Sequence, residues 1–331
     1  MSILPKQHTF FTQVRIPDQQ DKVEPRSNLM TIGSCFSDHI GNLLARYKFN
    51  CLPNPFGTIF NPLSICKSLD RALHKRWIEA DEIHSVGHRY FHFDYHSVFN
   101  TNSNEGVLSN INDKIQEVYS RLSSLDYMLF TFGTSIVYER KADKSIVANC
   151  HKVPSNQFER RMLCVDFMYD EASQRIAALK ELNPSLKIIL TVSPVRHTKE
   201  GLVQNSRSKS RLIELCHRIV DEHSGVMYYP SYEIMMDELR DYRFYKKDLI
   251  HPNEFAVDII WEKFMQAHFS ASAIQKVKDI GAIIAASNHK PFDEHSDGQI
   301  AFKKSQLNTI QNLKSLYPEV NFSEYETYFS T

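Results

Sequence analysis

A chain of 331 residues has room for one large α/β domain or for two ordinary domains. Its 39 basic and 39 acidic residues balance, which argues against nucleic acid or an anionic membrane surface as a partner. No apolar run is long enough for a membrane span, and residues 1–17 lack the apolar core of a secretion signal. The six cysteines are dispersed without a Cys-x-x-Cys pair, as in reduced thiols. We therefore expect a cytoplasmic protein.

Short apolar segments alternate with amphipathic helical stretches along most of the chain. The predicted strands are 28–32, 126–133, 186–194 and 225–231. Helices are expected over 37–48, 105–123 and 168–182, and over the stretch SKSRLIELCHRIVDEH that precedes the fourth strand. Helices of this length between strands imply right-handed βαβ crossovers and a parallel sheet covered on both faces. The predicted fold is therefore α/β, with a mostly parallel sheet between two layers of helices.

Two regions interrupt this alternation. Residues 80–100 are rich in aromatic residues and histidine and are expected to form an irregular hairpin or loop. Residues 135–158 read as two strands joined by the polar turn KADK. We therefore expect one domain over 1–270 with irregular insertions near 50–100 and 135–160. From about residue 271 the pattern is helical, with a polar break at SNHKPFDEHSDGQ, which predicts a C-terminal extension over 271–331 that packs on the domain or makes an oligomer contact.

Chemically capable side chains follow the predicted strands, at the sheet edge where parallel α/β proteins bind ligands. They are Ser34 and Cys35 after the first strand, Gly133, Thr134 and Ser135 after the second, Arg196 and His197 after the third, and Asp248 and His251 before the last helix of the domain. We expect these groups to meet in one site.

Cys35 stands at a strand-to-helix turn. Unpaired N–H groups and the dipole at a helix N-terminus favour negative charge, which lowers a thiol pKa and can hold an oxyanion. A buried packing cysteine is the alternative interpretation. Asp248-x-x-His251 suits a base whose tautomer is held by a carboxylate, although a surface loop before a helix N-cap at Asn253 would look the same.

In combination, these motifs resemble the SGNH/GDSL hydrolase superfamily. The string Gly33-Ser34-Cys35-Phe36 and the segments NCHKVP and SPVRH are similar to the GSCFA-domain family, a bacterial branch named for this turn. The resemblance covers roughly residues 25–270. It implies a three-layer α/β/α fold and needs no cofactor.

The resemblance also implies residue roles. Cys35 takes the nucleophile's position, His251 is the base, and Asp248 orients the base; Ser34 is the alternative nucleophile. The N–H groups of Cys35 and Gly57 are candidate oxyanion donors. Ser135 replaces the usual asparagine donor of the third motif, so Asn149 or His151 is considered as its substitute. The candidate substrate-binding residues are Gly133, Thr134, His151, Arg196 and His197.

The predicted function is hydrolysis or transfer of an ester or acyl group carried by a carbohydrate, a cell-envelope glycan or a lipid. Two alternatives stay open: a non-catalytic carbohydrate- or metabolite-binding protein, and redox sensing by Cys35. Arg196 either pairs with a substrate anion or braces the loop that follows it. Asp94, Tyr95 and His96 form either a pocket rim or a packed loop, and we favour the packed loop. His92, Asp94 and His96 alternate as on one strand face, but we predict no metal. A homo-oligomer is possible.

Overall fold

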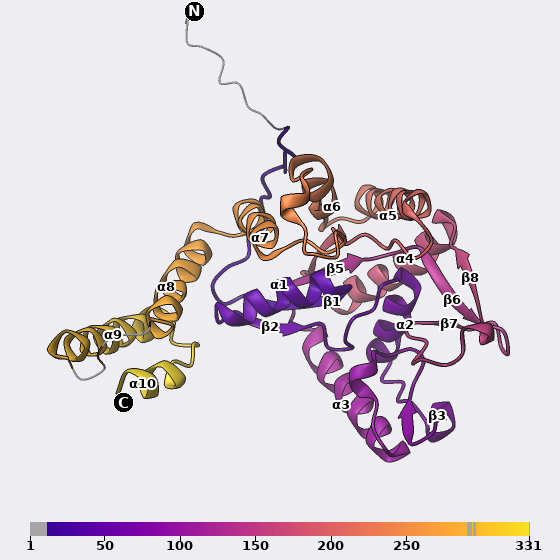
Figure 1. The fold of residues 1–331 in the computed structure, drawn as a ribbon, viewed down its shortest axis with the longest axis horizontal. Helices are drawn as coiled ribbons and strands as arrows, with labels where there is room; N and C mark the ends of the chain where they lie inside the picture. The colour runs from indigo at the N-terminus through magenta and orange to yellow at the C-terminus, as the bar shows by residue number, and fades with distance from the viewer. Residues whose placement is uncertain (1–11, 290–292, 294–295, 331) are drawn as a thin grey trace, which may run out of the picture.

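The computed structural model describes residues 12–289, 293 and 296–330 (Figure 1). Five parallel strands form the central sheet of this described chain, in the order β10-β9-β5-β1-β2. Their bounds are β1 Asn28–Gly33, β2 Asn50–Pro53, β5 Tyr127–Phe132, β9 Lys187–Val192 and β10 Val226–Tyr229. The four predicted strands are confirmed, and β2 is an additional edge strand beside β1.

The chain order of these strands across the sheet is 2-1-3-4-5, so successive connections reverse direction between β1 and β5. Open α/β sheets of this kind bind ligands beyond the carboxyl ends of the strands at such a reversal. Gly33 pairs with Thr131 where β1 lies beside β5, and Thr131 pairs with Thr191 where β5 lies beside β9. The turns after these three strands therefore open at one place.

Helices cover both faces of the sheet. Successive strand residues point to opposite sides, and both sets are apolar here, so each face needs a layer of helices to bury it. Met128, Phe130 and Phe132 of β5 pack towards one set of helices, and Tyr127 and Leu129 pack towards the other. The first layer holds α2 Pro62–Leu73, α3 Asn104–Leu122, α4 Val165–Leu182 and α5 Leu202–Glu222. The second holds α1 Cys35–Arg46, α6 Ser231–Glu233 with the π-helical turn Ile234–Glu238, and α7 Glu254–His268. The predicted three-layer α/β/α fold is confirmed.

Two insertions meet beside the sheet. The first contains the antiparallel hairpin of β3 His84–Val86 and β4 Arg89–Phe91. The second is a small antiparallel sheet of β6 Ile136–Arg140, β7 Ile146–Val147 and β8 Phe158–Met162, of which β8 was not predicted as a strand. A shared apolar cluster of Phe91, Phe93, Val147 and Phe158 joins them. Short 3₁₀ turns lie at Ala80–Glu82, Ser97–Phe99, Ser155–Gln157 and Tyr242–Phe244.

The C-terminal extension consists of α8 Ala271–Ser287, α9 Asp297–Leu316 and α10 Ser323–Ser330. It has its own apolar cluster and projects from the α7 end of the domain, away from β3 (Figure 1). Lys276 of α8 fastens it, because the buried Nζ donates to Pro25 O at 2.7 Å and pairs with Glu319 at 3.0 Å. The predicted helical tail is confirmed, and part of its polar break lies outside the described residues. No helix of the described chain combines the length and apolarity of a membrane span.

Candidate functional site

The turn after β1 is shaped by the close approach of two strands. Gly33 has φ +132°, and a Cβ built on it would lie 2.2 Å from the carbonyl oxygen of Thr131. Only glycine adopts this conformation at this separation without strain. Ser34 N then donates to the same carbonyl at 3.0 Å, and α1 begins at Cys35. The sequence thus forces Cys35 onto a helix N-terminus at the reversal of the strand order.

A buried asparagine holds this turn from the side. Asn54 Oδ1 accepts from Gly33 N at 2.9 Å, and Asn54 Nδ2 donates to Gly33 O at 3.2 Å and to Asp38 Oδ1 at 2.7 Å. The other Asp38 oxygen accepts from Thr58 Oγ1 at 2.7 Å. Sequence reasoning missed this clamp, although the turn-forming string NPFG marks its position after β2.

Ser34 and Cys35 differ sharply in access. Ser34 is fully buried, and its hydroxyl oxygen has no hydrogen-bond partner among the described residues. Cys35 is half-buried and lines a pocket of about 620 Å³. A substrate in this pocket therefore meets the Cys35 thiol, while the Ser34 hydroxyl lies beneath the turn.

The Asp248–His251 pair is formed as the spacing predicts. Asp248 Oδ2 lies 2.7 Å from His251 Nδ1, and Oδ1 accepts from the N–H groups of Ile250 and His251 at 2.9 and 3.0 Å. These hydrogen bonds, with those to the backbone contributing most, hold the pKa of Asp248 well below its usual range. A charged carboxylate at Nδ1 favours the tautomer that leaves Nε2 unprotonated, as a general base requires.

Arg196 braces the loop that carries this pair. Its Nη2 donates to Leu249 O, and its guanidinium lies 4.7 Å from the centre of the Tyr245 ring. Leu249 has φ +59°, a left-handed conformation that is uncommon for a branched residue. Arg196 was expected to bind substrate or to brace the loop that follows it. Its hydrogen bond to the Leu249 carbonyl braces a different loop, the one that carries Asp248 and His251, and its contact with substrate stays a prediction.

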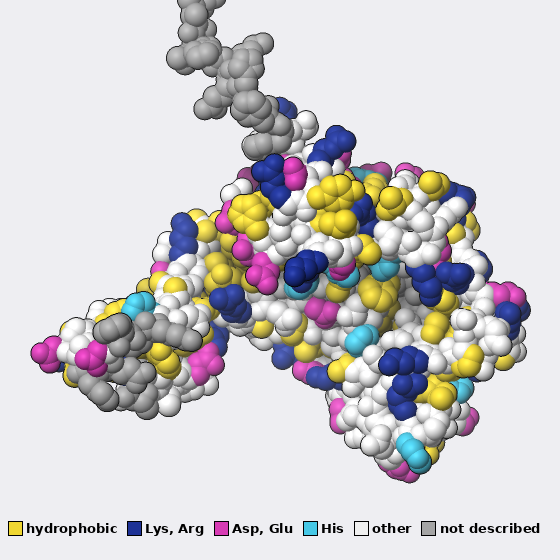
Figure 2. All heavy atoms as spheres, viewed as in Figure 1, with side chains coloured by type: hydrophobic (Ala, Val, Ile, Leu, Met, Phe, Trp, Pro, Cys, Tyr) yellow, Lys and Arg dark blue, Asp and Glu magenta, His cyan; other side chains and the backbone are white. Residues whose placement is uncertain are grey.

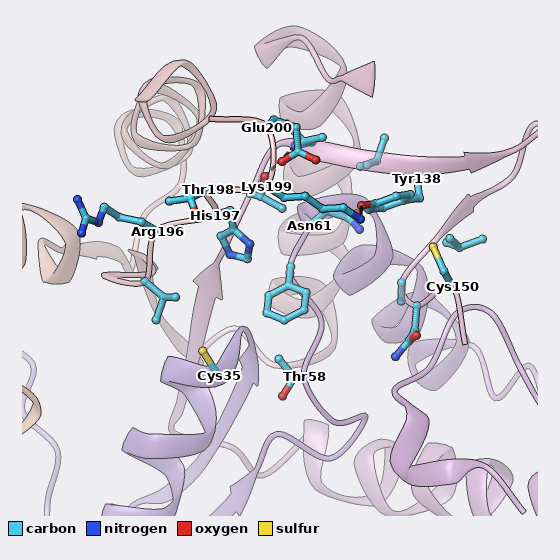
Figure 3. A pocket seen from close by; sticks show the side chains of 18 of the residues that line it. Cys35, Thr58, Asn61, Tyr138, Cys150, Arg196, His197, Thr198, Lys199 and Glu200 are labelled. Atoms are coloured by element: carbon cyan, nitrogen blue, oxygen red, sulfur yellow. Dashed lines mark hydrogen bonds between the residues drawn. The ribbon is translucent and has the colours of Figure 1, made fainter. Parts of the chain in front are cut away.

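Cys35 and His251 lie on the wall of the same pocket, together with Arg196 and His197. Figure 2 shows this face of the molecule hollowed near its centre, with histidine and hydrophobic side chains gathered there. The close-up shows Cys35 and Thr58 at one end of the pocket and Tyr138 and Cys150 at the other (Figure 3). Within the described chain no hydrogen bond joins the Cys35 sulfur to His251, and the hydrogen bonds that bear on the thiol come from the N–H groups of Cys35 and Phe36. Catalytic hydrogen bonds are often long before substrate binds.

The pKa of the Cys35 thiol is raised, whereas the sequence predicted that it would be lowered. Burial and the negative charge of Asp38 raise its pKa above the ordinary value for cysteine. The charge of Lys209 and the N–H groups of Cys35 and Phe36 act in the opposite direction but do not reverse the shift. The expected lowering by the helix N-terminus is therefore wrong, because desolvation outweighs it.

Two of the predicted oxyanion donors, Ser135 and Gly57, already donate hydrogen bonds to other groups of the protein. Ser135 is fully buried, with its N–H and hydroxyl bonded to Ser208 Oγ at 2.8 and 3.1 Å. Gly57 N donates to Asn54 O at 2.8 Å, and Gly57 lines a neighbouring groove. These two predictions are corrected, because the Gly57 N–H and both the N–H and the hydroxyl of Ser135 donate to other groups. Asn149 lines the pocket, and its Oδ1 accepts from His151 N at 2.8 Å; the donor role would fall to its Nδ2 and stays a prediction.

The predicted substrate-binding residues divide into two groups. Thr134, Arg196 and His197 line the pocket. His151 is buried against Phe91 outside the pocket wall, which corrects its predicted role, and Gly133 lies behind His197. Burial lowers the pKa of His197 to about 3, so the ring is neutral, and its buried Nε2 has no partner in the described part of the chain.

The His92, Asp94 and His96 side chains do not converge on a metal site. Asp94 pairs with Lys67 at 2.7 Å, and His92 Nδ1 accepts from Asp94 N at 3.1 Å. His96 lies apart, against Gly57 on the pocket wall. Within the described ranges, no group of three His, Cys, Asp or Glu side chains is placed to hold a metal ion. Among these residues the rim interpretation fits His96 and the packed-loop interpretation fits the other two.

Comparisons with known proteins place the chain by sequence. Residues 28–264 match the GSCFA family, and residues 280–331 match the GSCFA domain protein, C-terminal domain. No curated protein sequence gives a significant match.

Solved structures give distant likenesses. One is a carbohydrate esterase of family 3 from Talaromyces cellulolyticus, with 9% identity, a TM-score of 0.35, and coverage of 76% of this chain and 99% of that one. Another is the acetyl xylan esterase Est2A from the rumen bacterium Butyrivibrio proteoclasticus, with 9% identity, a TM-score of 0.34, and coverage of 74% and 64%. At these scores neither likeness carries an argument about activity.

Proposed function

This chain is a member of the GSCFA family, and from the pocket it builds we propose that it is a thiol-dependent hydrolase or acyltransferase acting on an ester or acyl group. One observation carries the proposal. Cys35, on a helix N-terminus, lines the same pocket as His251, whose Nδ1 is held by Asp248. A nucleophile, a base and a carboxylate that orients the base are the parts that acyl transfer needs.

The proposed reaction begins with ionisation of the thiol. His251 Nε2 takes the proton from Cys35 Sγ, and the sulfur attacks the carbonyl carbon of the substrate. The carbonyl oxygen becomes an oxyanion, and the alcohol leaves with the proton from His251, so that a thioester remains on Cys35. Water, or a second alcohol or amine, gives a proton to His251 and attacks the thioester. This second step releases the acid or the transferred acyl group and restores the thiol.

Two donors suit the oxyanion. The N–H of Cys35 stands at the open N-terminus of α1, where no helical acceptor exists. His197 lines the pocket with a buried, unpartnered Nε2, and its low pKa keeps it neutral. In the tautomer protonated at Nε2, the ring donates a hydrogen bond without taking the substrate's proton. We therefore assign His197 the place that sequence reasoning gave to Ser135.

The pocket walls suit an acyl group joined to a polar alcohol. Ile136, Val147 and Val195 give apolar surface for the acyl part. Thr58 and His96 border both this pocket and an open groove lined by Asp113 and Lys114, where the polar alcohol of a carbohydrate, glycan or lipid headgroup would lie. The partner we propose is therefore an acylated small molecule, glycan or lipid.

The test is labelling and turnover with a panel of activated acyl esters at neutral pH. Wild-type protein should release the alcohol, Cys35→Ala should abolish release, and His251→Ala should slow it about 100-fold or more, the usual contribution of a general base. Cys164→Ala, at an exposed thiol outside the pocket, is the matched control and should behave as wild type. Turnover that survives Cys35→Ala but is lost in Ser34→Ala would contradict the assignment.

A second candidate function is a binding protein without turnover. The raised pKa of Cys35 and the missing Cys35–His251 hydrogen bond favour it. It predicts saturable binding of an acylated carbohydrate or a metabolite, with no product formed and no loss of binding in His251→Ala.

A further inference from the structure

A lysine that the sequence motifs do not include reaches the end of the sheet at which Cys35 stands. Lys209 is carried by α5 and is 1% exposed. Its Nζ donates to Gly133 O at 2.8 Å and to Ser193 O at 2.7 Å. These carbonyls follow β5 and β9, so the side chain reaches from one helical layer to the edge of the sheet where the pocket opens.

Strand register puts this ammonium at the level of Cys35. Gly33, Thr131 and Thr191 are paired across β1, β5 and β9, and Cys35, Gly133 and Ser193 each follow two residues later. Hydrogen bonds continue the pairing past the strand ends, from Ser34 N to Thr131 O and from Ser193 N to Phe132 O. The nitrogen that bridges Gly133 and Ser193 therefore lies at the same end of the sheet as the Cys35 thiol.

Lys209 has no anionic hydrogen-bond partner among the described residues. Its other neighbour is the face of the Tyr232 ring, with Nζ 5.3 Å from the ring centre. Glu233 of α6 is the nearby carboxyl group, but it bonds to Tyr228 at 2.7 Å, and burial raises its pKa, which disfavours its charge. A buried ammonium bonded only to neutral carbonyls gains most from an anion that forms close by.

We infer that Lys209 is a positioning residue whose ammonium stabilises the thiolate of Cys35 and so sets the reactivity of the nucleophile. The charges are coupled in both directions. Burial lowers the pKa of Lys209, while the charges of Cys35 and Glu233 oppose that lowering, so the ammonium holds its proton best when the thiolate forms nearby. Lys209 in turn lowers the pKa of Cys35, against burial and Asp38, and also that of the neighbouring His197. Linkage requires this reciprocity.

The inference rests on Cys35 as the ionising nucleophile of the proposed function, but its test needs no turnover. The rate of alkylation by iodoacetamide is followed at Cys35 by peptide mass mapping from pH 6 to pH 10. In Lys209→Met, the apparent pKa of Cys35 should rise by about one unit, so alkylation at pH 7 slows about tenfold. The two rates should converge at high pH, where both thiols are ionised.

A matched control distinguishes the effect of the Lys209 charge on Cys35 from the effect of losing a lysine that bonds to backbone carbonyls of the sheet. Lys180 is partly buried, and its Nζ donates to Leu186 O just before β9 begins. This contact lies at the opposite end of the parallel strands from Cys35. Lys180→Met should leave the alkylation profile unchanged. Lys209→Arg, which keeps the positive charge, should restore much of the reactivity at pH 7.

Three results would overturn the inference: a Lys209→Met profile equal to wild type, an equal loss in Lys209→Met and Lys209→Arg, or an equal shift in Lys180→Met. Should Lys209→Met not fold, Lys209→Gln keeps a donor for the carbonyls without the charge and must show the same shift. If the profile moves as expected but no acyl ester is turned over, the proposed function fails and the coupling of Lys209 to Cys35 stands.

Discussion

The asparagine clamp on the nucleophile turn gives a prediction whose size follows from its contacts. Asn54 is 5% exposed and makes three side-chain hydrogen bonds, two to the backbone of Gly33 and one to the Asp38 carboxyl group. Asn54→Ala leaves the buried N–H of Gly33 without its acceptor, which costs about 1–3 kcal/mol. It also removes a donor to a carboxylate, worth about 1.5–3 kcal/mol. Because these effects overlap, we expect a loss of about 3–4 kcal/mol in the free energy of unfolding.

Urea unfolding followed by tryptophan fluorescence measures this loss, because Trp261 is buried in the helical layer that contains α1. Asn61→Ala is the matched control. Asn61 is also a buried asparagine, but it caps α2 through Ser64 N at 2.8 Å, and removal of such a cap costs about 1 kcal/mol. A loss of 1 kcal/mol or less in Asn54→Ala, no larger than in the control, would refute the clamp.

Three further predictions concern single side chains. Ser34→Ala removes a buried hydroxyl that has no partner, so it should change the free energy of unfolding by less than about 1 kcal/mol and leave acyl-ester turnover intact; loss of turnover would contradict the role of Cys35. Asp248→Asn should lower kcat/KM about 100-fold or more, since the amide no longer fixes the base tautomer of His251, and near-wild-type kinetics would exclude the pair from catalysis. His268 is fully buried, neither ring nitrogen has a partner within the described ranges, and burial lowers its pKa to about 3. Between pH 6.5 and pH 3 the unfolded chain binds a proton there that the folded chain does not, so stability falls as the pH falls, by about 1.4 kcal/mol per pH unit for this group. In urea titrations at several pH values, His268→Phe should reduce that slope by the same amount, and an unchanged slope would show that His268 does not titrate in this way.

The central sheet was predictable because its inner strands are unbroken apolar runs. All six residues of β5 are buried, and β9 is buried at five of six, so periodicity and length identify both. β2 was missed because Asn50–Pro53 is a four-residue edge strand with one buried position. β8 was missed because Phe158–Met162 exposes three charged residues in succession. Its pairing with β6 comes from tertiary contacts that no local pattern records.

Part of the site was also predictable, and the rest was not, for a physical reason. Cys35 and His251 follow from the rule that parallel strands end at one edge and from the three-residue spacing of Asp248 and His251. Asn54 and Lys209 act through side-chain hydrogen bonds to backbone groups far away in the sequence. Except for the Asp38 carboxyl group, their partners are backbone carbonyl and N–H groups, which carry no side-chain signal, so the sequence does not reveal these contacts.

The most direct test of the account is the identity of the atom that carries the acyl group. Wild-type protein mixed with an activated acyl ester and quenched in acid within the first turnover should gain one acyl mass. Peptide mapping should place that mass on Cys35 as a thioester that hydroxylamine cleaves at neutral pH. Cys35→Ala should gain no mass. An adduct on Ser34, or a wild-type protein that releases the alcohol while Cys35 stays unmodified, would contradict the claim that Cys35 is the nucleophile.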